Sequence, residues 1–281
     1  MSSATVPILV ASCDAYADVW SPFFTLFFRH WPDCPYPIHL GTNAKTFDDP
    51  RVRTIRVGTD RGWAAGVSAM LDRLSATHVI LLLEDFFLER QVDDAMVRSL
   101  VDIAQRSPDV ASIRLAPLPP PSEIRGTPFV GMPDLLRIVP AGTPYRVSAQ
   151  AAVWRVDALQ RYLRIGFSAW DFELIGSQLA DLSNDLFLGP VRPAVAYDHA
   201  IEKGRWRAEG IRICRENGID VETSGRGIIG AAEHARGSVA AMLRRNARSA
   251  FQTLTGARGS RLLQRLLVAR HLRRAARRMR S

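Results

Sequence analysis

The sequence predicts an α/β protein: one mixed, mostly parallel central sheet flanked by helices, followed by a basic helical tail. Short apolar runs alternate with amphipathic stretches over the first two-thirds of the chain, which predicts strands alternating with helices. One of the apolar runs is unbroken, as expected for a strand buried on both faces. The composition becomes arginine-rich after Gly230, which predicts a division into residues 1–230 and 231–281.

Composition limits the class of protein. A chain of 281 residues with 47% hydrophobic content can bury one sizeable core. Its three cysteines are odd in number and widely spaced, unlike a disulfide framework or a paired zinc site. Residues 1–7 lack the basic and apolar regions of a signal peptide, and no other apolar run reaches membrane-spanning length. We therefore expect a reduced, cytoplasmic setting.

Strands and helices are expected to alternate from the amino terminus. Residues 6–12 form a short apolar run typical of a buried strand, and Asp14 follows it. Large aromatic residues recur on one face of residues 18–30, which predicts a helix that packs on the sheet and ends before Pro32. The next expected elements are strands 37–40 and 52–57, a helix over 63–74 and a strand over 78–83.

Two carboxylates end the clearest of these strands. Residues 78–83 are followed by Glu84 and Asp85, and then by the apolar residues 86–88. Open α/β sheets bind ligands just outside the carboxyl ends of their strands, so the pair is a candidate site for Mg²⁺ or Mn²⁺ beside a diphosphate. The alternative is a polar turn in solvent. The large apolar residues that follow favour the wall of a cleft.

The second half of the chain is expected to add further helices and antiparallel strands to the same sheet. Prolines at positions 117 and 119–121 cannot continue a strand, and we expect them to open a loop over the mouth of the site. Residues 205–217 suit a helix that stops at Gly218. The other expected elements are helix 92–105, strands 111–115, 135–139 and 145–154, and helices 156–163 and 170–182.

Three residues of this half are candidates for binding an acceptor sugar. Ser148 and Gln150 would share one face of strand 145–154, because side chains alternate along a strand. Gln150 could then hydrogen-bond to a sugar, while Trp154 and Trp170 could stack on sugar rings. For Trp154 the alternative is a structural ring in the core.

Five motifs together resemble those of bacterial GT-A-fold glycosyltransferases of cell-surface polysaccharide and lipopolysaccharide synthesis. The resemblance covers residues 6–230. It rests on Ser-Cys-Asp-Ala-Tyr at 12–16, Asp-Arg-Gly-Trp at 60–63, Leu-Glu-Asp-Phe-Phe-Leu at 83–88, Tyr-Arg-Val-Ser-Ala-Gln at 145–150 and Trp-Asp-Phe-Glu at 170–173. It implies a GT-A-like fold and an enzyme that transfers a sugar from a nucleotide-sugar donor to a glycan or lipid-linked acceptor.

The resemblance also implies where the donor would bind. Asp14 and Tyr16 would lie beside the nucleotide, with Asp60 near the same pocket. The metal motif of the family is Asp-any-Asp, whereas this chain has Glu84-Asp85-Phe86, a departure that leaves the metal requirement open. The alternatives are structural roles: Asp14 could cap the first helix, and Tyr16 could be a packing aromatic.

A carboxylate at the start of helix 170–182 is expected to be the general base. In inverting GT-A enzymes such a group takes the proton of the attacking hydroxyl, and the resemblance favours Glu173 over Asp171. Acids near a helix start are also favoured by the helix dipole, which alone would explain Asp171. Lys203 and Arg205 could hold the pyrophosphate of the donor, or could belong to a solvated basic surface.

Two other functions fit parts of the pattern. A nucleotidyltransferase should have a glycine-rich, basic loop after the first strand, but residues 12–18 contain neither glycine nor a basic residue. A non-catalytic binding protein, for sugar or nucleic acid, would explain the unusual residues at 84–86.

The carboxyl-terminal segment is expected to bind a membrane. From Val239 to Ser281 it has twelve arginines and no acid; since the whole chain has a net charge of +9, the preceding residues have a net charge of −3. Leucines recur at helical spacing among the arginines of residues 260–279, as in helices that lie on anionic lipid. The leucine stripe argues against nucleic acid. We expect a peripheral protein at the cytoplasmic face of the plasma membrane.

Overall fold

The computed structural model describes residues 5–117 and 126–230. The chain divides into two compact units, Met1–Tyr197 and Asp198–Ser281. The predicted basic tail at 231–281 and the prolines at 119–121 lie outside the described residues, so the expectations for them stay predictions.

The first unit is built on an eight-stranded sheet. In chain order its strands are β1 (Ile8–Ala11), β2 (Ile38–Thr42), β3 (Val52–Arg56), β4 (His78–Leu83), β6 (Val110–Arg114), β7 (Leu136–Ile138), β8 (Ala152–Arg155) and β9 (Leu186–Pro190). Their order in the sheet is β3-β2-β1-β4-β8-β6-β9-β7. The strands from β3 to β4 are parallel, as are β6 and β9, whereas β8 and β7 run antiparallel to their neighbours. The predicted α/β fold with a mixed, mostly parallel sheet is confirmed.

The chain switches direction across the sheet between β1 and β4. From β1 it moves outward to β2 and β3, and it then returns to β4 on the other side of β1. The last residue of β1, Ala11, pairs with the last residue of β4, Leu83, so both strands leave the sheet at the same level. Ligands of open α/β sheets bind at such a switch point.

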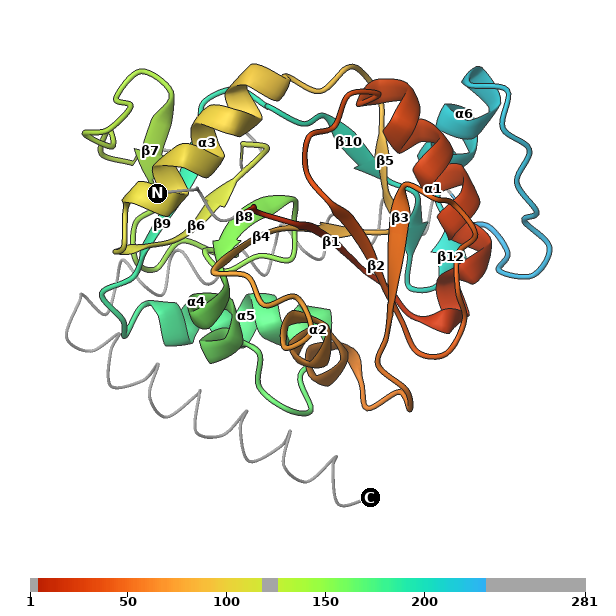
Figure 1. Cartoon of the computed structure of the whole chain (residues 1–281), viewed down its shortest axis with the longest axis horizontal. Coiled ribbons are helices and arrows are strands. Elements are labelled where there is room, and N and C mark those ends of the chain that lie inside the picture. Colours follow the sequence, from red (N-terminus) through yellow and green to blue (C-terminus); the bar gives the residue numbers. More distant parts are fainter. Residues whose placement is uncertain (1–4, 118–125, 231–281) are drawn as a thin grey trace. The chain divides into compact units, whose positions relative to one another are not determined.

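Helices cover both faces of this sheet (Figure 1). α1 (Ala17–His30) and α3 (Asp94–Arg106) lie on one face, and α2 (Trp63–Leu71), α4 (Val156–Tyr162) and α5 (Ala169–Ala180) lie on the other. In α1 the expected apolar face is buried: Trp20, Phe23 and Phe27 are at most 2% exposed. None of the helices in the described ranges is both long and apolar enough to span a bilayer.

The strand expected over residues 145–154 forms only at its end. β8 begins at Ala152, and the residues before it form turns and bends. Tyr145 has a φ of 59°, a left-handed conformation that does not occur within a regular strand. The expectation that Ser148 and Gln150 share one face of a strand is therefore wrong. They belong to a loop, residues 145–151, that leads into β8.

Two strands that lie wholly within the first unit have no counterpart among the sequence predictions. β9 ends in Gly-Pro, a pair that normally indicates a turn. It becomes a strand because it pairs with β6 on one side and β7 on the other. β5 (Phe86–Leu88) is only three residues long, too short for a period-two pattern to be recognised.

The described part of the second unit begins with a small hairpin. β11 (Ile201–Glu202) and β12 (Arg205–Trp206) pair antiparallel. Lys203 and Gly204 join them with φ angles of 52° and 79°, the conformation of a two-residue hairpin turn. A further short strand, β10 (Tyr197–His199), spans the division between the units.

A short helix, α6 (Ala208–Glu216), follows the hairpin. It starts later than the predicted helix over 205–217, because the first two residues of that range are in β12. It ends before Gly218, which has the expected left-handed φ, here 66°. Trp206 is 1% exposed and donates its indole N–H to the carbonyl of Glu222 at 3.2 Å, so it anchors this unit.

Candidate functional site at the carboxyl edge of the sheet

The predicted carboxylate pair lies in the turn that follows β4. Glu84 and Asp85 are the two turn residues between β4 and β5. Glu84 is 7% exposed and Asp85 is half-buried. The pair thus leaves the sheet at the switch point, and the alternative of a fully solvated turn does not hold for Glu84.

Three loops meet beside this turn. Cys13 follows β1, and burial raises the pKa of its thiol; the negative charges of Glu84 and Asp60 raise that pKa further. Charge effects of this kind act over short distances, so both carboxylates lie near Cys13. The structure therefore brings together two residues that the sequence placed separately, Asp60 for the donor and Glu84 for a metal. Asp60 is exposed and accepts the backbone N–H of Gly62 at 2.8 Å.

Asp14 joins the loops that follow β1 and β2. It begins a short 3₁₀ helix, η1 (Asp14–Tyr16), and its carboxylate accepts the backbone N–H groups of residues 43–45 at 3.0–3.2 Å. Its side chain does not cap α1, whose N-cap is Tyr16. Asp14 is thus a latch between two loops of the sheet edge, while Tyr16 is half-buried there. Their contacts with a nucleotide stay predictions.

Glu173 is held by the loop 145–151. From α5 its Oε1 accepts the hydroxyl of Ser148 at 2.7 Å and the backbone N–H of Ala149 at 3.0 Å. Both bonds go to the same oxygen, and Oε2 makes no hydrogen bond to any residue of the described ranges. The carboxylate is half-buried. This geometry fixes the side chain and leaves one oxygen for another group.

Asp171 has a different environment. It forms a capping box with Ser168: its Oδ2 accepts the backbone N–H of Ser168 at 3.1 Å and the Ser168 hydroxyl accepts the backbone N–H of Asp171 at 3.1 Å. These bonds satisfy donors at the start of α5. The local structure therefore accounts for Asp171 without catalysis, as the helix-start alternative proposed.

Tyr197 connects the two carboxylate sites. Its ring stacks on that of Phe86, next to Asp85, with centroids 4.4 Å apart, and its hydroxyl accepts the backbone N–H of Ala151 at 3.4 Å. Burial raises the pKa of the phenol, and the charges of Asp85 and Glu173 raise it further. Tyr197 therefore contacts both β5, which follows the turn after β4, and the loop that holds Glu173.

A buried arginine at this edge was not expected from the sequence. Arg114 is the last residue of β6, is 4% exposed, and donates from Nη2 to the carbonyl of Tyr145. Burial lowers the pKa of its guanidinium to about 10, and the negative charge of Glu173 opposes that shift. The signal that could have found it is a charged residue inside the predicted strand 111–115, between Ile113 and Leu115.

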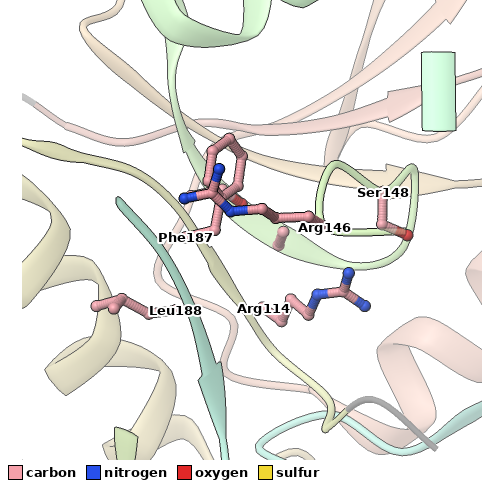
Figure 2. Close-up of a pocket in the computed structure, with 7 residues that line it drawn as sticks. Arg114, Arg146, Ser148, Phe187 and Leu188 are labelled. Atoms are coloured by element: carbon pink, nitrogen blue, oxygen red, sulfur yellow. The ribbon is translucent and has the colours of Figure 1, made fainter. Parts of the chain in front are cut away.

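A second buried arginine, Arg146, has a structural role. It donates to the carbonyls of Val139, Ala180 and Asp185 at 2.7–3.2 Å, and its guanidinium lies over the ring of Phe187 at 4.7 Å. Figure 2 shows it extended across that ring, with the guanidinium of Arg114 on the Ser148 side. The hollow that these residues line leaves essentially no volume for a water molecule, so it is a packed junction.

The three predicted acceptor residues differ in exposure. Trp154 is 1% exposed and packs against the rings of Tyr162, Phe172 and Phe187. It is a core residue and not a sugar-stacking surface, which corrects the prediction. Trp170 is 58% exposed at the start of α5, and Gln150 is half-buried in the loop before β8; their acceptor contacts stay predictions.

The predicted pyrophosphate ligands lie in the second unit. Lys203 is in the hairpin turn, 63% exposed, with its Nζ 4.0 Å from the carboxylate of Glu202. Arg205 is half-buried in β12. Their predicted role in donor binding is neither supported nor contradicted by these positions.

The residues present fit a metal only if the substrate supplies further ligands. Among the described residues, no group of three or more histidine, cysteine, aspartate or glutamate side chains could enclose a metal ion. Glu84 and Asp85 offer two adjacent carboxylates. Mg²⁺ is commonly held by one or two carboxylates together with substrate phosphates, and the pair suits that mode.

Comparisons with known proteins identify similar folds but no relative by sequence. No protein-family model matches the sequence, and no curated protein matches it. A mannosyltransferase from Pyrobaculum calidifontis, solved with GDP-mannose and Mn²⁺, is 13% identical, with a TM-score of 0.48 over 97% of this chain and 81% of that one. The galactosyltransferase LgtC, solved with donor and acceptor sugar analogues, is 14% identical, with a TM-score of 0.35 over 56% of this chain and 60% of that one.

A nucleotide-transferring enzyme is similar as well. A cytidylyltransferase from Leptospira borgpetersenii is 10% identical, with a TM-score of 0.42 over 65% of this chain and 75% of that one. The similar structures thus include glycosyltransferases, the class that the sequence motifs resemble. With TM-scores below 0.5 they do not choose between the two activities.

Proposed function

We propose that this chain is an inverting, nucleotide-sugar-dependent glycosyltransferase of cell-envelope polysaccharide synthesis. The observation that carries the proposal is the joint position of two carboxylate sites at one sheet edge. Tyr197 lies beside both: its ring stacks on Phe86, next to Asp85, and the charges of Asp85 and Glu173 both act on its phenol. The site at Asp85 would bind the diphosphate of the donor through a metal ion, and the site at Glu173 would deprotonate the acceptor hydroxyl.

Glu173 is the proposed general base of a single displacement. The acceptor oxygen forms a bond to the anomeric carbon while the bond from that carbon to the diphosphate oxygen breaks. The acceptor proton passes to Glu173, and the nucleoside diphosphate leaves with the bonding electrons. Ser148 and Ala149 hold Oε1, which leaves Oε2 for the acceptor hydroxyl.

The donor would bind where the loops after β1, β3 and β4 meet. Asp14 and Tyr16 are the proposed neighbours of the nucleotide, with Asp60 beside them, and Lys203 and Arg205 are proposed ligands of the pyrophosphate. The closeness of Asp60 and Glu84 to Cys13 supports a single donor site at this edge.

Glu84 and Asp85 are the proposed ligands of Mg²⁺ or Mn²⁺. Such an ion, when bound, would neutralise the negative charge that grows on the leaving diphosphate. Asp85 is half-buried and Glu84 is 7% exposed, so the two carboxylates would meet the ion from the protein side of the site.

The acceptor is proposed to be a glycan or a lipid-linked sugar at the cytoplasmic face of the membrane. Trp170 supports this, because it is 58% exposed one helical turn before Glu173 and could stack on a sugar ring. The arginines of residues 239–281 would hold the enzyme at anionic lipid.

A thermal-shift screen tests the donor site without an acceptor. The full chain is incubated with nucleotides and nucleotide sugars, with and without Mn²⁺ or Mg²⁺. We expect one nucleotide family to raise the melting temperature, the rise to vanish in Asp85→Asn, and the matched control Glu89→Gln, an exposed acid at the far end of β5, to keep it. If no nucleotide stabilises the protein, the binding-protein alternative is favoured instead.

A further inference from the structure

A buried arginine, Arg114, interacts with the carboxylate of Glu173. Arg114 is 4% exposed at the end of β6, and within the described residues its Nη1 has no hydrogen-bond partner. Burying a charged guanidinium with an unpaired N–H is unfavourable. Buried charged groups with perturbed pKa values cluster at functional sites, where they act on neighbouring charges.

Arg114 and Glu173 bind the same loop from two sides. Arg114 Nη2 donates to the carbonyl of Tyr145, whereas Glu173 Oε1 accepts from Ser148 and Ala149. Arg114 also lines the same packed junction as Ser148, toward which its guanidinium points (Figure 2). Both side chains thus hold residues 145–149, and the negative charge of Glu173 acts on the guanidinium of Arg114.

The loop 145–151 contains an unfavourable backbone conformation that surrounding contacts must stabilise. Tyr145 is in the left-handed region at a φ of 59°, which is unfavourable for an aromatic residue and is tolerated where surrounding contacts fix it. Its carbonyl is the one that Arg114 binds. The arginine therefore acts on the shape of the loop as well as on the charge of the carboxylate beyond it.

We infer that Arg114 is a positioning residue for Glu173: its guanidinium holds the loop that aims the carboxylate, and its positive charge acts on that carboxylate. Among the described residues, Glu173 acts electrostatically on Arg114 and on Tyr197, and Asp85 acts on Tyr197 as well. Arg114 is the cation of this set, and with a pKa of about 10 it is charged at neutral pH. The catalytic meaning of the inference rests on the proposed function, but the coupling of the two side chains does not.

The inference is tested by titrating Glu173 directly. The full chain is labelled with ¹³C at the glutamate carboxyl carbons, and the Glu173 signal is identified by its loss in Glu173→Gln. Removal of a nearby cation makes a carboxylate harder to form, so in Arg114→Met we expect the Glu173 signal to titrate at a higher pH than in the unchanged protein. In Arg114→Lys, which keeps the charge, we expect a titration close to that of the unchanged protein.

Arg146→Met is the matched control. Arg146 is buried like Arg114, but it is paired with backbone carbonyls and with Asp181 at 3.6 Å. We expect its loss to lower the melting temperature and to leave the Glu173 titration in place. If Arg114→Met folds and Glu173 titrates as before, Arg114 has only a structural role. If Arg114→Met does not fold, Arg114→Gln takes its place, and an unmoved Glu173 signal in it overturns the inference.

Activity then separates this inference from the proposed function. If sugar transfer is found, the acidic limb of its pH profile should move upward in Arg114→Met and stay in Arg146→Met. If Glu173→Gln has no effect on transfer while the carboxyl signal still responds to Arg114, the base assignment fails and the coupling stands.

Discussion

Asp171 and Glu173 are two residues apart on α5, yet they have different hydrogen-bond partners and therefore different structural roles. Asp171 closes a capping box with Ser168, whereas Glu173 is held by Ser148 and Ala149. One stabilises the start of the helix, and the other is aimed at the loop before β8. A sequence motif of alternating aromatic and acidic residues does not distinguish these uses, because the distinction depends on a loop whose Ser148 lies 25 residues before Glu173.

Two substitutions separate helix capping from catalysis. We expect Glu173→Gln to abolish sugar transfer while donor-induced stabilisation remains, since the amide cannot take a proton but keeps the shape. We expect Ser168→Ala to lower the free energy of unfolding by about 1 kcal/mol through loss of the cap and to retain transfer. Radiolabelled transfer and urea denaturation measure the two effects. Near-normal turnover of folded Glu173→Gln would show that another group is the base.

Cys13 reports on the carboxylates at the switch point. Its raised pKa means less thiolate at pH 8, so we expect slower alkylation than for a free thiol. Glu84→Gln removes a negative charge that raises this pKa, so alkylation of Cys13 should become faster. Mass spectrometry of the Cys13 peptide follows the rate, with Glu89→Gln as the control. Equal rates in all three proteins would mean that Glu84 and Cys13 are not neighbours.

Site residues were predictable where a charge follows an apolar strand run, and less so elsewhere. Glu84 and Asp85 stood out because they end six apolar residues, and they do lie at the sheet edge. Arg114 stands inside the predicted strand 111–115 and not at its end, so it was missed. The burial of Trp154 could not be derived from the sequence, because it depends on rings that belong to α4, α5 and β9.

At the scale of elements, strong local patterns were read correctly and weak ones were not. Strand 78–83 and the aromatic helix after β1 lie where periodicity placed them. β9 and the loop 145–151 were misjudged because pairing partners and a left-handed Tyr145, rather than local composition, decide their conformation. Sheet neighbours that are distant in sequence leave no local signal in either segment.

The latch between the loops after β1 and β2 depends on one carboxylate. Asp14 accepts three consecutive backbone N–H groups, and Asp14→Ala removes their acceptor. We expect a loss of about 1–3 kcal/mol in the free energy of unfolding and faster amide hydrogen exchange at residues 43–45. Asp48→Ala, in the same loop, is the control. Unchanged exchange at 43–45 would mean that the latch is not formed in solution.

At the scale of the whole molecule, charge is divided along the chain. The twelve arginines of residues 239–281 face a remainder with a net charge of −3. We expect the full chain to sediment with vesicles that contain anionic lipid and not with neutral ones, and binding to fall as salt rises. Leu→Ser changes at 262, 263 and 266, which keep every arginine, should weaken binding. Undiminished binding of that variant, or preference for DNA over vesicles, would contradict the membrane prediction.

The order of the sheet also bears on edge-to-edge pairing with a second copy of the chain. At one end, segment 127–129 covers β7, with hydrogen bonds of 2.9 Å from Ile138 N–H to the Thr127 carbonyl and 3.0 Å from Phe129 N–H to that of Leu136. At the other end, β3 is the last strand, and Arg53 and Arg56 are exposed on it. A bare strand edge is a template for pairing with another copy, and two cations there make stacking of like edges repulsive. Among the described residues, the arginines of β3 are thus the feature that disfavours pairing of this strand edge with a second copy.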